Sequence, residues 1–202
     1  MLKIEKRYLP DGQYIKAPVK KQNIILHHTV SSNADSPWRW WASTPERVAT
    51  AYIVAKDGTV TECFDPSHWA YHLGMKHPRN TEFSRRSVGI EIVNEGQVRR
   101  RGDLWEWNFL HGAKPGIYRG EVVEAQPWRG FSFWAAYAQE QYEAVGELCG
   151  MLCDRFGIAR TVCDSLSLDL TAPDRFGVCS HRNLVASKFD LSPAFDFQKF
   201  KF

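Results

Sequence analysis

The stretch Asn23-Ile-Ile-Leu-His-His28, followed by Thr29 and Val30, is the most informative part of the chain. Positions 24–26 are apolar without interruption over a length that suits a strand, which is typical of a strand buried on both faces of a sheet. A histidine at the C-terminal end of such a strand stands at the edge where open α/β sheets place their functional sites. The stretch therefore predicts a central buried strand that delivers a histidine to a site.

Further strand patterns lie on either side of this stretch. Residues 51–54 and 60–64 predict two strands joined by a tight turn, because Asp57-Gly58 supplies the positive φ angles that the turn needs. Residues 87–93 predict another buried strand that is apolar at almost every position except Glu91. Residues 178–181 predict a last short strand.

The helix patterns are fewer. Apolar residues at steps of three and four predict the strongest helix over 133–156, ended by Gly157. Ser43-Thr44-Pro45-Glu46 predicts the start of a short helix, and residues 193–200 predict a closing helix. Strands and helices thus intermix, so we expect an α/β fold with a central mixed β-sheet flanked by helices.

Length and composition favour a single domain over residues 1–202. The chain has 202 residues, of which 44% are hydrophobic, enough for a core and too many for a wholly disordered chain. No apolar run approaches the roughly 18–20 residues of a membrane span. Within the domain we expect a basic N-terminal arm at 1–21 and an irregular loop insertion at 97–133, whose aromatic residues either contact a sugar or pack on one another.

Charge and cysteine content exclude other classes. The formal net charge is only +3, so the basic residues near the N-terminus indicate a solvated face rather than a nucleic-acid interface. Five cysteines, an odd number, argue against a disulfide framework and favour buried thiols. Residues 1–10 lack the apolar region of a standard secretory signal. We therefore expect synthesis in the cytoplasm, with action either there or on the cell wall after release by another route.

Four motifs appear in a characteristic order: Ile-Ile-Leu-His-His-Thr-Val (24–30), Ala-Tyr-His-Leu-Gly (70–74), Ser-Val-Gly-Ile-Glu-Ile (87–92) and Ser-His-Arg…Lys-Phe-Asp (180–190). Together they resemble the type-2 N-acetylmuramoyl-L-alanine amidases, which include phage endolysins, anhydro-muropeptide amidases and animal peptidoglycan recognition proteins. The resemblance covers roughly residues 20–200. The sequence departs from the family pattern at Ser180, where glycine is usual, and at Thr50, where one branch carries a catalytic tyrosine.

The resemblance implies a set of site residues. His27, His181 and Asp190 match three ligands of one zinc ion, Glu91 matches the catalytic acid/base, and Lys188 matches a lysine that supports the reacting carbonyl. His72 matches a position at the substrate cleft, and its neighbour Tyr71 and the more distant Asn94 are further expected substrate contacts.

The residue types suit that chemistry. Two imidazoles and one carboxylate leave a fourth zinc position open, which is typical of a catalytic site. Glu91 is a charge in an apolar strand: facing inward, burial would raise its pKa toward neutrality, whereas facing outward it would be an ordinary solvated residue.

The implied activity is zinc-dependent hydrolysis of the amide between N-acetylmuramic acid and L-alanine, with peptidoglycan or a soluble muropeptide as substrate. A lytic endolysin, a secreted effector and a recycling enzyme all fit. The alternatives are a catalytically inactive peptidoglycan-binding module and a zinc hydrolase that acts on a different amide.

Overall fold

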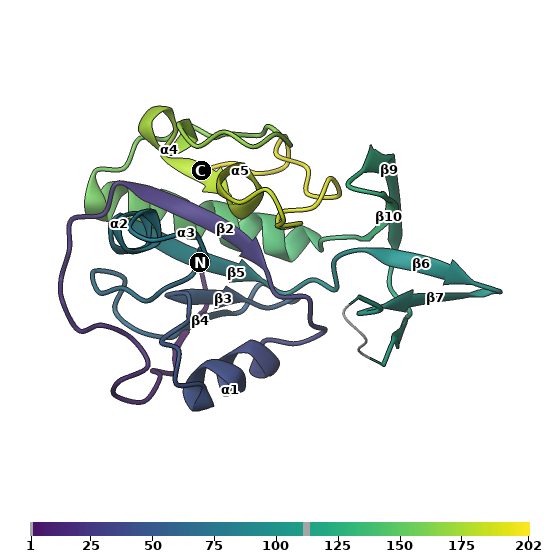
Figure 1. Cartoon of the computed structure of the whole chain (residues 1–202), viewed down its shortest axis with the longest axis horizontal. Coiled ribbons are helices and arrows are strands. Elements are labelled where there is room, and N and C mark those ends of the chain that lie inside the picture. The colour runs from purple at the N-terminus through teal and green to yellow at the C-terminus, as the bar shows by residue number, and fades with distance from the viewer. Residues whose placement is uncertain (1, 111–113) are drawn as a thin grey trace.

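A six-stranded sheet forms the centre of the molecule in the computed structural model, which describes residues 2–110 and 114–202 (Figure 1). The strands in chain order are β1 (Ile4–Lys6), β2 (Asn23–His28), β3 (Tyr52–Val54), β4 (Val60–Glu62), β5 (Ser87–Ile92), β6 (Val98–Arg101), β7 (Leu104–Trp107), β8 (Gly116–Tyr118), β9 (Val122–Trp128), β10 (Phe131–Ala135) and β11 (Val178–Ser180). The helices are α1 (Asp35–Ser43), α2 (Arg79–Arg86), α3 (Gln139–Phe156), α4 (Ala172–Arg175) and α5 (His181–Leu184).

The central sheet has the strand order β1-β4-β3-β5-β2-β11. β2 pairs in parallel with both β5 and β11, and β3 joins β5 in parallel but β4 in antiparallel fashion. The expected mixed sheet is therefore confirmed, with the 24–26 stretch in one of its most buried strands. The predicted turn at 55–59 joins β3 to β4.

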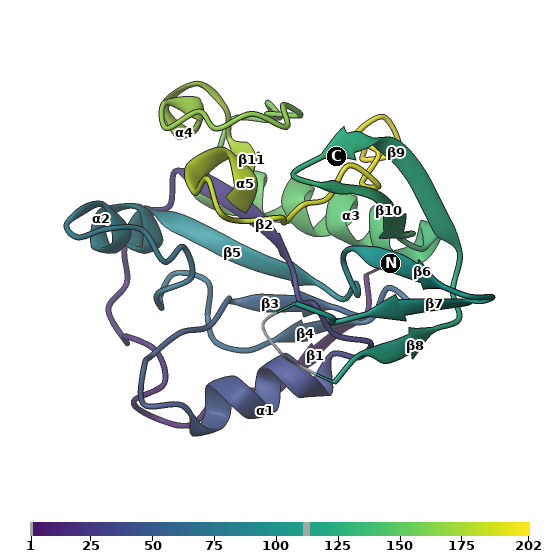
Figure 2. The same ribbon diagram turned by 45° about the vertical axis from the view of Figure 1, so that its right-hand side comes forward.

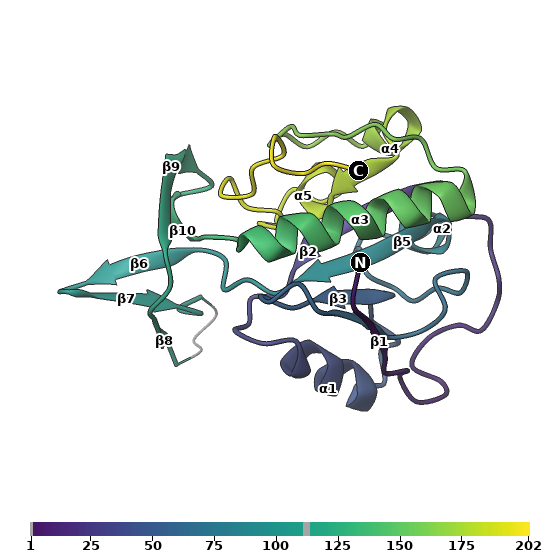
Figure 3. The same ribbon diagram turned by 180° about the vertical axis from the view of Figure 1, so that it is seen from behind.

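One face of the central sheet packs against α3, and the other carries His27. Side chains alternate along β2, so Ile24, Leu26 and His28 face one side while Ile25 and His27 face the other. The first side packs against the apolar stripe of α3, which lies across the sheet when the molecule is seen from behind (Figure 3). His27 thus lies on the face that α3 leaves free.

The described residues of 97–135 form two small sheets, not the irregular loop that we expected. β6, β7 and β8 make a three-stranded antiparallel sheet, seen side by side in Figure 2, and β9 and β10 make a hairpin. The hairpin turns through Arg129 and Gly130, both at positive φ, as a two-residue turn of this kind requires. An arginine at the first turn position is an uncommon signal, which explains why the sequence pattern did not predict it.

Three helix predictions are wrong: two of the predicted helices do not form, and one begins later than predicted. The Ser43–Glu46 segment ends a helix instead of starting one, because Pro45 forces Thr44 into an extended conformation and stops α1 at Ser43. The long helix begins at Gln139, since residues 131–135 belong to β10 and complete the hairpin. The tail at 193–200 forms turns instead of a helix, in which Phe195 packs on Tyr142 of α3 while Phe197 and Phe200 pack on Phe195.

Two smaller expectations are confirmed. All five cysteines are buried with free thiols. The basic residues of 1–21 are exposed with one exception, Lys21, which is 1% exposed. Of the described helices, none is long and apolar enough to cross a membrane.

Candidate active site

Three side chains from distant parts of the chain converge on one point. β2 supplies His27, β11 runs directly into α5 with His181 as its first residue, and the following loop returns Asp190. His27 Nδ1 lies 2.9 Å from His181 Nδ1 and 3.1 Å from Asp190 Oδ2, and His181 Nδ1 lies 2.9 Å from the same oxygen. The backbone amide of Arg182 donates to the carbonyl of Asp190 at 2.7 Å and holds the loop against α5.

The second nitrogen of each imidazole shows which tautomer it adopts. His181 Nε2 lies 2.7 Å from the carbonyl oxygen of Leu73, which can only accept, so Nε2 carries the proton and Nδ1 has the lone pair.

A longer chain of hydrogen bonds gives the same answer for His27. The Ser87 hydroxyl donates to the carbonyl of Phe83 at 2.6 Å, so its oxygen accepts from His72 Nε2 at 2.9 Å. His72 Nδ1 is then an acceptor, and His27 Nε2–H donates to it at 2.9 Å. His27 therefore also turns a lone pair toward the point of convergence.

This donor set fits a metal ion. Two imidazole lone pairs and a carboxylate oxygen at about 3 Å from one another would repel unless a cation lay between them. Burial lowers the pKa of His27 to about 4, so its ring is neutral at physiological pH, as a metal ligand must be. Two histidines and one aspartate are a ligand set that zinc accepts.

Gly89 makes room for the His72 ring beside β5. A Cβ atom at this position would lie 2.8 Å from Thr50 Cγ2 and 3.1 Å from His72 Nδ1. The glycine of the Gly-Ile-Glu motif thus lets His72 bridge Ser87 and His27 across the sheet.

Glu91 stands beside the ligands. It pairs in register with His27 across β2 and β5, so both side chains project from the same face. Its Oε2 atom is buried and has no hydrogen-bond partner among the described residues. Burial in the first place, and then the charge of Asp190, raise the pKa of Glu91 to about 8, while Lys188 acts in the opposite direction. The structure thus places Glu91 inward rather than on a solvated face.

A cavity of about 540 Å³ opens over these groups. Six of the predicted site residues line it: His27, His72, Glu91, His181, Lys188 and Asp190. Trp40 and Trp41 of α1 form part of the wall. Asn108 and Leu110 form another part, and they belong to the β-rich insertion, the described residues of 97–135. The insertion therefore contributes directly to the site.

Two of the expected substrate contacts lie elsewhere. Asn94 is fully buried: its Nδ2 donates to the carbonyls of Ala135 and Ala136, and its Oδ1 accepts from the backbone amide of Gly96. These bonds connect the end of β5 to the insertion. Tyr71 packs edge-on against Trp69 outside the cavity. Sequence reasoning did not identify Ser87 or the Leu73 carbonyl, because a serine at a strand start and a backbone oxygen carry no motif of their own.

Comparison with known proteins identifies the class. Residues 17–190 match the sequence family Amidase_2, described as N-acetylmuramoyl-L-alanine amidase. The chain belongs to this family of type-2 N-acetylmuramoyl-L-alanine amidases. No curated protein matches it in sequence.

Solved structures agree on the fold. A selenomethionine derivative of AmpD superposes with a TM-score of 0.57 at 16% identity, covering 99% of this chain and 93% of the other. AmiD from E. coli, solved with an anhydro-N-acetylmuramic acid peptide, gives 0.58 at 17% identity over 92% and 58%. The amidase LysC from Clostridium intestinale URNW gives 0.54 at 13% identity over 98% and 94%. Family and fold together support a peptidoglycan amidase activity.

Proposed function

We propose that the protein is a zinc-dependent N-acetylmuramoyl-L-alanine amidase, which hydrolyses the amide between N-acetylmuramic acid and L-alanine. The observation that carries the proposal is the convergence of the His27, His181 and Asp190 lone pairs beside Glu91, whose Oε2 atom is buried. When bound by these three ligands, zinc would supply Lewis acidity, polarising the amide carbonyl and acidifying a water molecule.

The protein groups around the ligands divide the remaining work. Glu91 accepts a proton from the attacking water and returns it to the leaving amine, a transfer that needs a carboxyl whose pKa lies near the working pH. Burial raises the pKa of Glu91 into that region. A cation at the neighbouring ligands would offset the charge of Asp190 and so lower the pKa of Glu91 again. The Lys188 ammonium faces the same cavity and stabilises the negative charge that develops on the carbonyl oxygen.

The alternative is a catalytically inactive peptidoglycan-binding module. A binding module needs the cavity but neither a set of lone pairs that converge on one point nor a buried carboxyl beside them. The presence of both groups of residues favours the enzyme.

The test is digestion of purified sacculi with the zinc-loaded protein, followed by mass spectrometry of the released products. We expect free stem peptides that begin at L-alanine, and no release after treatment with a chelator. Soluble anhydro-muropeptides are the second substrate: cleavage of these alone would indicate a recycling role, and cleavage of sacculi a lytic role. Binding to sacculi without release from either substrate would establish the binding module instead.

Variants separate the metal ligands from the proton-transfer group. His27→Ala should lose bound zinc and activity together, whereas Glu91→Gln should keep zinc and lose most turnover. His77→Ala is the matched control, because His77 is an exposed histidine in the loop before α2 and should keep both. Activity in zinc-free His27→Ala would contradict the proposed role of the metal.

A further inference from the structure

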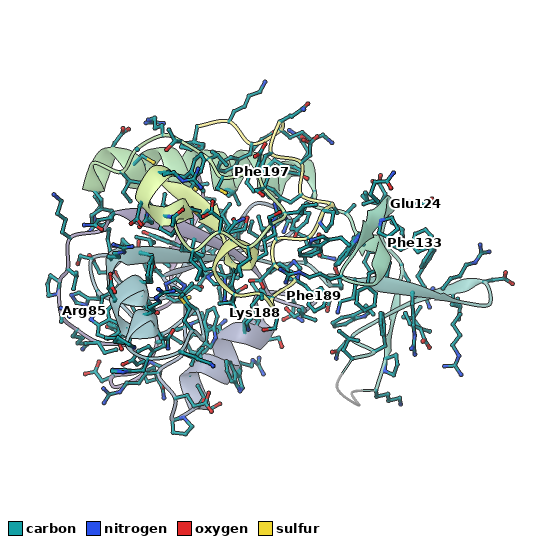
Figure 4. All side chains as sticks on the ribbon, turned by 45° about the horizontal axis from the view of Figure 1, so that its top comes forward. Arg85, Glu124, Phe133, Lys188, Phe189 and Phe197 are labelled. Carbon is teal, nitrogen blue, oxygen red and sulfur yellow. The ribbon has the colours of Figure 1, made fainter. Side chains whose placement is uncertain are left out.

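The loop that carries Lys188 and Asp190 contacts the tip of the β9–β10 hairpin, more than fifty residues earlier in the chain. Figure 4 shows Lys188 and Phe189 between the main body and the strands that carry Glu124 and Phe133. The contact joins the β-rich insertion to the two site residues that come last in the sequence.

Aromatic packing makes up one part of this contact. The Phe189 ring centroid lies 6.0 Å from that of Trp128 and 5.7 Å from that of Phe131, both in edge-to-face geometry. It also lies 6.5 Å from the centroid of Trp134, which is fully buried in the main core. Phe189, which also lines the cavity, is thus packed against the hairpin.

A hydrogen bond from Arg129 makes up the other part. Its Nη1 donates to the backbone carbonyl of Lys188, and its guanidinium lies 4.4 Å from the Trp128 ring centroid and 5.9 Å from that of Phe189. Because the guanidinium is stacked on Trp128, its donor is oriented before it meets the carbonyl.

The rest of the loop is held from the opposite side. The buried guanidinium of Arg182 donates to the carbonyls of Leu191 and Ser192, and its backbone amide donates to that of Asp190. The segment before Asp190 is less supported: Ser187 is exposed, and the amide of Lys188 reaches the Val185 carbonyl at 3.1 Å. The hairpin tip therefore contacts the middle of the loop, where Arg182 does not reach.

We propose that the tip of the β9–β10 hairpin positions the Lys188–Asp190 loop, with Arg129 as the principal positioning residue. This inference rests on the proposed function, since it assigns the hairpin to the lysine and the metal ligand of that site. The hairpin fixes the backbone between Lys188 and Asp190, so that the ammonium and the carboxylate reach the cavity together. Without the hairpin contact, part of the free energy of metal binding and of transition-state stabilisation is used to order the loop. Both interactions therefore become weaker.

Arg129→Ala tests the proposal. Residue 129 has a φ of 51°, which costs alanine about as much as arginine, so the substitution removes the contact and leaves the turn conformation unchanged. Arg100→Ala is the matched control, because Arg100 is an exposed arginine of the same insertion and its Nε donates to the nearby Gly102 carbonyl. Arg129→Lys restores the charge and one donor.

Three measurements are made on each full-length variant: hydrogen exchange of the peptide that spans 186–190, zinc affinity by competition with a chromophoric chelator, and kcat and KM on a soluble muropeptide. For Arg129→Ala we expect faster exchange in that peptide, zinc binding weaker by roughly 3- to 10-fold, the loss that corresponds to one hydrogen bond, and a lower kcat with a smaller change in KM. Arg129→Lys should recover part of each loss, and Arg100→Ala should match the wild type.

Unchanged exchange and zinc affinity in Arg129→Ala would overturn the proposal, as would equal effects in Arg100→Ala. Exchange and zinc affinity do not depend on turnover. A wild-type protein without amidase activity would therefore refute the proposed function while these two measurements still decided whether the hairpin holds the loop.

Discussion

Replacing His72 with phenylalanine should weaken zinc binding, although His72 is not one of the three ligands. The phenylalanine ring fills the space beside Gly89 but offers no acceptor, so His27 Nε2–H is left buried without a partner. An unsatisfied buried donor costs about 1–3 kcal/mol. Loss of a hydrogen bond to a metal-binding histidine typically reduces metal affinity by about 10- to 100-fold, which is about 1.4–2.7 kcal/mol. The two ranges overlap, and we expect the zinc dissociation constant to rise by about that factor.

The assay is competition for zinc against a chromophoric chelator at pH 7.5, with the melting temperature of the metal-free protein as a check on folding. Ser87→Ala provides a graded companion: it keeps the His72 ring but frees it to adopt the other tautomer, so its effect should be smaller. The sequence resemblance assigned His72 to the substrate cleft, and a substrate contact gives a different result. A zinc affinity within threefold of the wild type, together with a raised KM, would refute the role of His72 in positioning His27.

Three further substitutions or conditions test other parts of the structure. Lys21→Met should stabilise the protein at pH 6: the Lys21 residue is 1% exposed, and burial lowers its pKa to about 7, below the ordinary 10.5. The folded state then binds fewer protons than the unfolded chain between about pH 7 and 10.5, so wild-type stability rises with pH across that window. The stability gained by Lys21→Met should therefore be smaller at pH 9.5 than at pH 6. An equal difference in melting temperature between variant and wild type at both pH values would contradict this. The metal-free protein should lose stability as the pH falls from 6.5 toward 4, because burial lowers the pKa of His28 to about 4 and the unfolded chain binds the proton first. That shift corresponds to a loss of about 3 kcal/mol from His28, measurable by urea unfolding at pH 7 and pH 4.5, and a flat profile would contradict it. Gly89→Ala should cost about 1–3 kcal/mol of stability and weaken zinc binding, since its Cβ would displace His72 and press on Thr50; Thr50→Ala added to it should restore part of the stability, and no such recovery would place the clash elsewhere.

The fold was largely predictable because its main elements carry local patterns. The apolar run at 24–26, the Asp57-Gly58 turn and the stripe from Tyr142 to Leu152 each express a period that one segment can satisfy without knowledge of the rest. The errors fall where the deciding contact is distant. Pro45 is compatible both with a helix that begins at it and with one that ends before it, and the local pattern does not choose between the two. The aromatic residues of 105–133 pair across strands, a relation that no short window reveals.

Sequence alone was enough to establish which residue types are available and the family to which they belong: two histidines, an aspartate, a glutamate and a lysine in the order of the amidase motifs. It could not establish what the second nitrogen of each histidine contacts, because Leu73, His72 and Ser87 reach those atoms only when the sheet is assembled. It also left open whether Glu91 faces inward, which the register of β2 with β5 decides. The contact between the β9–β10 hairpin and the Lys188 loop could not be read from the sequence either. Its hydrogen bond and ring contacts depend on the positions of groups in space, and the two segments meet only in the folded chain.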